Sequence, residues 1–164
     1  MKVALYPGSF DPITNGHLDV LERALGVFDR VVLAVLANPR KTPLLPVATR
    51  VAVIESALRD AGLGPDRVTV TTFDGLTVDA AHASGATAIV RGLRAVSDFE
   101  TELQLAHNNR RLAPDVDTVF FMTAAEHGYV SSSLVKEIAS FGGDVAGMIP
   151  PAAGEALRAA FERA

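Results

Sequence analysis

The residues of this sequence that are best suited to chemistry occur in four short polar segments. Each segment follows a run of apolar residues, and the four are Ser9–His17, Asn38–Lys41, Arg91–Arg94 and Ala125–Ser133. Together they supply histidine, lysine, arginine and serine side chains, with glycine close by. These groups suit the binding of small anions, because they combine positive charge with hydroxyl and main-chain N–H donors. Thiol nucleophiles, disulfides and thiolate metal sites are excluded, since the chain contains no cysteine.

The first of these segments has the pattern of a turn that opens a helix. Gly8 would let a ligand approach the main chain, and Thr14 would cap a helix whose first N–H groups are unpaired. The positive end of the helix dipole disfavours an imidazolium ion, so we expect His17 to be a neutral hydrogen-bond donor. The phosphate-binding patterns GxxxxGK(S/T) and GxGxxG are missing from the sequence, which disfavours P-loop ATPases and dinucleotide dehydrogenases.

Each of these residues also has a purely structural interpretation. Arg91 and Arg94 could be solvated charges after a strand, and Lys41 an exposed residue of a proline-rich loop. Ser131–Ser133 could cap a helix, and Glu102 could lie on the surface of a polar helix. We interpret His82 and His107 as structural, because the histidines lack metal-ligand spacing.

Apolar runs and helical periodicity alternate along the chain. The apolar runs predict strands at Val3–Tyr6, Val31–Leu36, Val68–Phe73, Ala88–Val90 and Thr118–Met122. The periodic segments predict helices at Thr14–Phe28, around Val51–Leu58, at Thr77–Ser84, at Asp98–Leu112, from Ser131 to about Gly142, and from Ala152 onward. The alternation predicts a doubly wound, Rossmann-like α/β fold: a parallel five-stranded sheet with helices on both faces. We expect a single domain over residues 1–164, with a C-terminal helical tail from about residue 150. Ligands of such folds bind at the carboxyl ends of the strands, where all four polar segments would meet.

Composition limits the partners and the compartment. The chain has 164 residues, 49% of them hydrophobic and 21% charged, a net charge of -4 and a pI of about 5.5. This acidic balance disfavours a nucleic-acid partner. Apolar runs are far shorter than the ~20 residues of a membrane span, and the first predicted strand leaves no room for a signal peptide. We therefore expect a cytoplasmic protein without a membrane partner.

Three ordered motifs carry a resemblance to a known family. Gly8–Pro12 followed by Thr14–His17 resembles the (H/T)xGH signature of the nucleotidyltransferase superfamily, and Ser131–Glu137 resembles its ISSTxxR signature, in a serine-rich form with lysine. Ile89–Glu100 and Glu102–Arg110 are similar to the corresponding segments of the bacterial phosphopantetheine adenylyltransferase family. The resemblance extends from the first strand to about residue 150.

The resemblance implies transfer of the adenylyl group of ATP to 4'-phosphopantetheine, which gives dephospho-coenzyme A and pyrophosphate. The acceptor phosphate is ionised near neutral pH, since its second pKa is about 6, so no general base is needed. Positioning and electrostatic stabilisation would supply the catalysis. The resemblance assigns catalytic roles to His17, Lys41 and Arg94. The substrate-binding residues would be Ser9, Lys41, Thr77 and Arg91. The ATP-binding residues would be Ser9, Phe10, His17, Gly92, Leu93, Arg94, Glu102, His127, Gly128, Tyr129, Val130, Ser131, Ser132 and Ser133.

The resemblance also implies partners. We expect Mg²⁺ bound with ATP rather than in a carboxylate cluster of the protein, a homohexamer, and feedback inhibition by coenzyme A. The alternatives are a superfamily member with a nicotinamide mononucleotide or glycerol-phosphate acceptor, and a non-catalytic nucleotide-binding domain.

Overall fold

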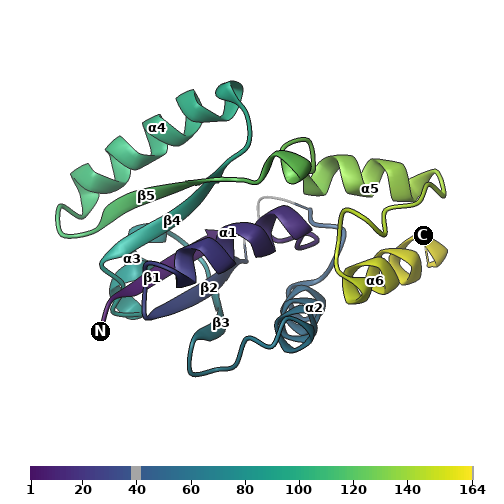
Figure 1. Cartoon of the computed structure of the whole chain (residues 1–164), viewed down its shortest axis with the longest axis horizontal. Helices are drawn as coiled ribbons and strands as arrows, with labels where there is room; N and C mark the ends of the chain where they lie inside the picture. Colours follow the sequence, from purple (N-terminus) through teal and green to yellow (C-terminus); the bar gives the residue numbers. More distant parts are fainter. Residues whose placement is uncertain (38–41, 164) are drawn as a thin grey trace.

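The computed structural model describes residues 1–37 and 42–163. Its centre is a parallel sheet of five strands in the order β3-β2-β1-β4-β5 (Figure 1). The strands are β1 (Val3–Gly8), β2 (Arg30–Leu36), β3 (Val68–Phe73), β4 (Ala88–Leu93) and β5 (Asp117–Met122). The strand order reverses at β1, which is the point where a doubly wound fold opens a crevice for ligands. The predicted fold class is confirmed.

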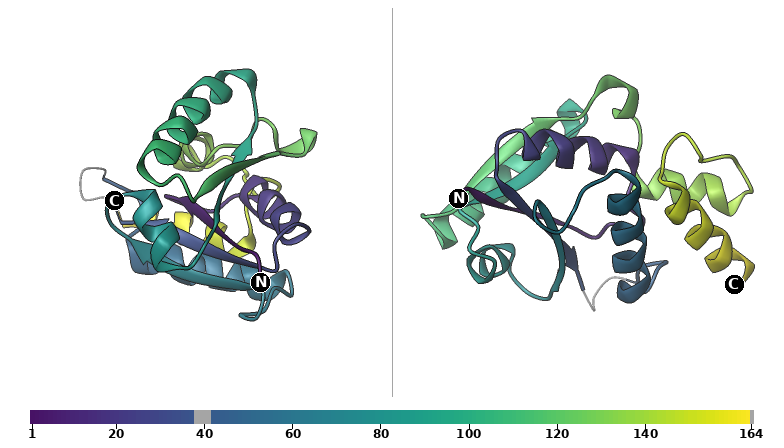
Figure 2. Two further views of the ribbon diagram at one scale, coloured as in Figure 1. Left: turned by 90° about the vertical axis from the view of Figure 1, so that its left-hand side faces the viewer. Right: turned by 60° about the horizontal axis from the view of Figure 1, so that its bottom comes forward.

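Helices cover both faces of this sheet (Figure 2). They are α1 (Asn15–Leu25), α2 (Val47–Asp60), α3 (Thr77–Ala83), α4 (Val96–Leu112), α5 (Ser132–Ser140) and α6 (Pro151–Glu162), with a short 3-10 helix, η1 (Ala125–His127). Side chains of β1 alternate between the faces because the period of a strand is two. Ala4 and Tyr6 join the core formed with α1, α2, α5 and α6, whereas Val3 and Leu5 pack with α3.

The last two helices extend the domain beyond the carboxyl ends of the strands. In Figure 1, α5 and α6 lie together at the end opposite the N-terminus. Leu157 of α6 is buried in the same core as Ile54 of α2, so the C-terminal segment is anchored to the sheet layer through α2. Within residues 1–37 and 42–163, every helix is too short or too polar to span a membrane.

One predicted boundary differs in a way that matters for the site. The sequence predicts a strand that ends at Val90, before the polar segment Arg91–Arg94, but β4 continues to Leu93. Pairing with β5 explains the extension, since Arg91 and Gly92 face Phe120 and Phe121 in the parallel register. Arg91 therefore projects from a strand, whose main chain is held by the sheet, rather than from a free loop.

Candidate active site

A cleft of about 610 Å³ lies where the strands end. Its walls come from Gly8 at the end of β1, Leu36 at the end of β2, Phe73 at the end of β3, Gly92 near the end of β4, and Thr123 just after β5. The cleft thus occupies the position that the strand order predicts for a ligand.

His17 and Thr14 cap the start of α1 by a reciprocal pair of hydrogen bonds. The main-chain N–H of Thr14 donates to Nδ1 of His17 (2.9 Å), and the main-chain N–H of His17 donates to Oγ1 of Thr14 (3.3 Å). Nδ1 is therefore an acceptor, so a neutral imidazole carries its proton on Nε2, on the far side of the ring. Since His17 lines the cleft, Nε2–H is available to donate to a ligand there.

Electrostatics keep this imidazole neutral. Burial, and then the positive charges of Arg94 and Arg91, lower the pKa of His17 from 6.5 to about 4. A protonated ring would also lose the bond from Thr14, because both of its nitrogens would then be donors. His17 is consequently a neutral donor throughout the neutral pH range.

Aromatic packing holds the His17 ring in place. Phe10 lies edge-on to His17 with ring centroids 5.1 Å apart, and edge-on to Tyr6 at 5.4 Å. Phe10 is 3% exposed and takes a φ of 46°, in the left-handed region that costs a bulky side chain roughly 1–3 kcal/mol. Its ring also covers Gly8, where an added Cβ would lie only 3.0 Å from two ring atoms. Glycine at position 8 therefore makes this packing of Phe10 against the loop sterically feasible.

Arg91 is bound by a carboxylate from α4. Its Nε and Nη2 donate to Oε2 and Oε1 of Glu102 at 2.8 and 2.5 Å, and its Nη1 donates to the carbonyl of Pro7 (3.2 Å). Burial lowers the pKa of Arg91, but the hydrogen bonds and charge of Glu102 outweigh it and raise the pKa above its ordinary value. The bidentate pair holds a permanent cation in one orientation at the cleft wall.

Arg94 links β4 to the segment before α5. Its Nη1 donates to the carbonyl of Val130 (2.9 Å), and its Nε lies 3.3 Å from a carboxylate oxygen of Asp98. Ser131 caps α5, since its Oγ accepts from the main-chain N–H of Leu134 (3.1 Å). The start of α5 thus lines the cleft as a second helix start, and the first N–H groups of a helix are suited to anions.

Most of the predicted site residues meet at this cleft. The cleft-lining ones are Ser9, Phe10, His17, Thr77, Arg91, Gly92, Arg94, Glu102, Val130, Ser131, Ser132 and Ser133. Leu93 is only 9% exposed and belongs to the core, and His127, Gly128 and Tyr129 lie in and after η1 beside the cleft. Tyr129 is 91% exposed. Lys41 lies outside the described residues.

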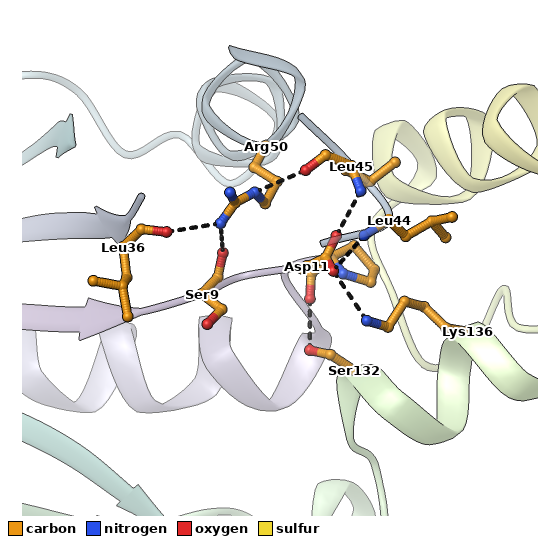
Figure 3. A network of polar contacts seen from close by, with 9 residues as sticks. Ser9, Asp11, Leu36, Leu44, Leu45, Arg50, Ser132 and Lys136 are labelled. Atoms are coloured by element: carbon orange, nitrogen blue, oxygen red, sulfur yellow. Dashed lines mark hydrogen bonds and ion pairs between the residues drawn. The ribbon is translucent and has the colours of Figure 1, made fainter. Parts of the chain in front are cut away.

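A charged network beside the cleft was not predicted. Figure 3 shows Asp11, Arg50 and Lys136 joining the first loop, the segment before α2, and α5. Arg50 carried a signal in the sequence, because it lies on the same helical stripe as the apolar residues Ile54 and Ala57. A charged residue on a buried stripe indicates buried hydrogen-bond acceptors.

Metal binding by the protein itself is not supported by the described residues. Within residues 1–37 and 42–163, histidine, aspartate and glutamate do not form a group of three or more that could hold an ion. The two carboxylates of the cleft wall, Asp98 and Glu102, are each paired with an arginine. A hard divalent cation prefers several oxygen ligands, and the Mg²⁺ expected with ATP stays a prediction.

Comparisons with known proteins identify the relatives of this chain. The Cytidylyltransferase-like family model matches residues 5–138. A phosphopantetheine adenylyltransferase of Geotalea daltonii is 50% identical over 163 residues, which cover 99% of each chain. That of Gloeobacter violaceus is 53% identical over 159 residues, covering 97% of this chain and 96% of the relative. The chain belongs to the phosphopantetheine adenylyltransferase family.

Solved structures share the fold at much lower identity. A putative nicotinate-nucleotide adenylyltransferase from Vibrio parahaemolyticus is 19% identical, with a TM-score of 0.72 over 99% of this chain and 96% of the other. The Plasmodium falciparum nicotinic acid mononucleotide adenylyltransferase in complex with NaAD is 14% identical, with a TM-score of 0.73 over 96% and 95%. Membership of the phosphopantetheine adenylyltransferase family therefore rests on the sequence relatives, and these structures support the nucleotidyltransferase fold.

Proposed function

We propose that this chain transfers the adenylyl group of ATP to 4'-phosphopantetheine, giving dephospho-coenzyme A and pyrophosphate. The observation that carries the proposal is the cleft at the switch point of the sheet, in a chain about 50% identical to phosphopantetheine adenylyltransferases over nearly its full length. Arg91, Arg94 and the starts of α1 and α5 converge on this cleft. Such an arrangement suits a reaction between two phosphate anions.

The reaction is an in-line displacement. An ionised oxygen of the acceptor phosphate attacks the α-phosphorus of ATP, a new P–O bond forms, and the bond to the bridging oxygen of pyrophosphate breaks. No proton has to be removed from the nucleophile. The protein therefore has to bring two anions together and stabilise the charge that develops at the α-phosphate.

His17 is the residue we assign to that charge. Its Nε2–H faces away from the helix cap, and a neutral donor can stabilise a phosphate oxygen without competing with the nucleophile for a proton. A fixed tautomer needs no rearrangement during the reaction. Catalysis by this donor comes from its preorganisation.

The cationic side chains neutralise the remaining phosphate charges of the substrates. We assign Arg94 to the leaving pyrophosphate, because it lies beside the start of α5. We assign Arg91, Lys41 and Thr77 to the acceptor phosphate and its pocket, and Ser9, with Ser131–Ser133, to the phosphates of ATP. Mg²⁺ is expected with ATP, where it would neutralise phosphate charge, and no step of this proposal depends on a protein-held ion.

The remaining parts of the proposal concern the oligomeric state, the cellular compartment and the regulation of the enzyme. We propose a cytoplasmic homohexamer that coenzyme A inhibits by feedback. Exposed apolar side chains on α4 and β5 support self-association: Phe99 is 47%, Leu105 46%, Leu112 58% and Met122 65% exposed. Analytical ultracentrifugation tests the assembly, and a monomer at micromolar concentration would contradict it.

One assay tests the activity. Pyrophosphate release is measured with ATP and phosphopantetheine, with nicotinamide mononucleotide as the alternative acceptor, and with CTP in place of ATP. We expect turnover with ATP and phosphopantetheine. A folded sample that binds ATP but releases no pyrophosphate with phosphopantetheine would overturn the proposal. Turnover with nicotinamide mononucleotide instead would point to another acceptor class.

A further inference from the structure

One guanidinium fixes three separate segments next to the cleft. Arg50 of α2 is 2% exposed. Its Nε donates to the carbonyl of Leu45 (3.0 Å), and its Nη1 donates to the carbonyls of Ser9 (2.7 Å) and Leu36 (3.0 Å). Ser9 directly follows β1, Leu36 is the last residue of β2, and Leu45 lies just before α2. The Arg50 side chain therefore joins the first loop to both ends of the connection between β2 and α2 (Figure 3).

A buried carboxylate binds the same connection from the other side. Asp11 is 5% exposed. Its Oδ1 accepts from the N–H of Leu45 (2.9 Å), and its Oδ2 accepts from the N–H of Leu44 (3.0 Å) and from Nζ of Lys136 (2.9 Å). Each bond involves an ionised group, so each is stronger than an ordinary hydrogen bond.

The two charged groups meet at a single residue. Leu45 donates its N–H to Asp11 and accepts at its carbonyl from Arg50, and its side chain is fully buried. Both of its main-chain polar groups are thereby satisfied in the interior. On α5, Ser132 donates from Oγ to the carbonyl of Pro12 (2.8 Å), which reinforces the bond between Lys136 and Asp11.

The position of this network indicates a role in the reaction. Asp11, Arg50 and Lys136 line an adjoining recess of about 270 Å³ that also contacts Ser9 and Ser132, residues of the cleft wall. Stability alone is a weak explanation for the pair between Asp11 and Lys136, because replacing a buried ion pair by apolar residues is often neutral. By contrast, a displacement of ~1 Å between reacting groups can cost ~100-fold in rate.

We propose that Asp11, Arg50 and Lys136 are positioning residues, which fix the first loop against the start of α5 at the wall of the cleft. The proposal rests on the proposed function for its catalytic consequence. None of the three needs to contact a substrate. Arg50 acts through the carbonyl of Ser9, and Asp11 acts through Lys136 of α5, so that Ser9 and the α5 serines face one ligand.

The test uses the mildest break in the network, Lys136→Met, because Lys136 lies at its more exposed side. Asp11 then keeps its two main-chain donors, and we expect the variant to fold. We expect kcat to fall about tenfold while the KM for ATP changes by less than about twofold, since a misplaced loop affects the transition state more than ground-state binding. Lys136→Arg keeps the ion pair and should recover most of the rate.

Two further measurements keep the result unambiguous. Hydrogen exchange of peptides covering residues 9–17 and 131–135 should accelerate in Lys136→Met, and this readout does not depend on which acceptor the enzyme uses. The control is Arg67→Met, which removes an arginine that also holds main-chain carbonyls, those of Leu25 and Asp29, at the amino end of the sheet. Its kcat should equal that of the wild type.

The outcomes separate the two proposals. Inactivity of the wild type with phosphopantetheine would overturn the proposed function, and the exchange measurement would still test the network. An active wild type together with wild-type kcat and exchange in Lys136→Met would overturn the positioning role. A loss of kcat in Lys136→Met that only matches its unfolded fraction would overturn it as well.

Discussion

The two ends of the sheet use the same kind of residue for different purposes. At the amino end, Arg67 is exposed and donates to the carbonyls of Asp29 (2.9 Å) and Leu25 (2.7 Å). At the carboxyl end, Arg50 is buried and donates to three carbonyls in three segments. An exposed clamp can exchange its bonds with water, whereas a buried one must keep them all. The main chain at the carboxyl end of the sheet is therefore more tightly constrained.

Backbone strain is also greater at the carboxyl end of the sheet. Glycine takes a positive φ in turns at both ends, with 70° at Gly62 and 67° at Gly85 at the amino end and 107° at Gly75 after β3. At the carboxyl end, Phe10 takes a φ of 46° although it carries a large side chain. Packing against Tyr6 and His17 offsets the cost of this conformation. The comparison shows that strain and buried polarity concentrate where the ligand is expected.

The largest effect is expected from removing the neutral donor at the carboxyl end. His17→Ala should lower kcat by about a hundredfold or more, because a preorganised donor to the transition state is lost. ATP affinity should fall much less. His82→Ala, which breaks an exposed contact with Asp115, is the matched control and should keep wild-type kcat. Parallel losses of kcat and ATP affinity in His17→Ala would mean that His17 binds the ground state.

A smaller effect is expected in the dependence of stability on pH. The folded-state pKa of His17, about 4, lies below its ordinary value of 6.5. As pH falls below 6.5, the unfolded chain takes up a proton that the folded chain refuses, so the free energy of unfolding decreases until about pH 4. The loss at pH 5 should be about 2 kcal/mol.

Urea unfolding at pH 7 and pH 5 measures this loss. His17→Gln removes the titrating group, so its free energy of unfolding should fall less than that of the wild type between the two pH values. If the free energy of unfolding fell equally in the two proteins between pH 7 and pH 5, the imidazole would not be held neutral in the folded state. The carboxyl end of the sheet would then lose one of its differences from the amino end.

The smallest effects concern packing. A Cβ at Gly92 would lie 2.9 Å from Cγ2 of Val20, so Gly92→Ala should push α1 from β4 and cost about 1–2 kcal/mol. Gly154 lies in α6, and its nearest contact to an added Cβ is at 4.0 Å. Gly154→Ala should therefore stabilise the protein by about 0.5–1 kcal/mol. The thermal unfolding midpoint should be lower than that of the wild type in Gly92→Ala and higher in Gly154→Ala. An unchanged midpoint in Gly92→Ala would mean that the close approach of α1 to β4 is not required.

Much of this molecule could be predicted because its signals are local. Strands with both faces buried appear as continuous apolar runs, and helices appear as periodic stripes, so the alternation and the parallel sheet follow from neighbouring residues. The motif at Thr14 and His17 predicted a helix start with a neutral histidine for the same reason. The reciprocal cap confirms the helix start, and the lowered pKa supports the neutral form.

Pairings between distant segments could not be predicted in this way. Asp11 and Lys136 are 125 residues apart, and each lies in a motif that assigned it no partner. The same holds for Arg91 and Pro7, which are 84 residues apart. The extension of β4 to Leu93 depends on its register with β5, which is a property of the assembled sheet.

By itself, the sequence determined the family, the order of the elements and the chemical types gathered at the strand ends. The family follows from the resemblance of three motifs to those of known proteins. The order of the elements and the chemical types follow from periodicity and composition, which the chain carries before it folds. Only the tertiary structure decided which nitrogen of His17 is the donor, that Glu102 orients Arg91, and that Asp11 and Arg50 hold Leu45 between them. These are decided by burial, because a polar group removed from water must find its partner among whatever segments the fold brings beside it.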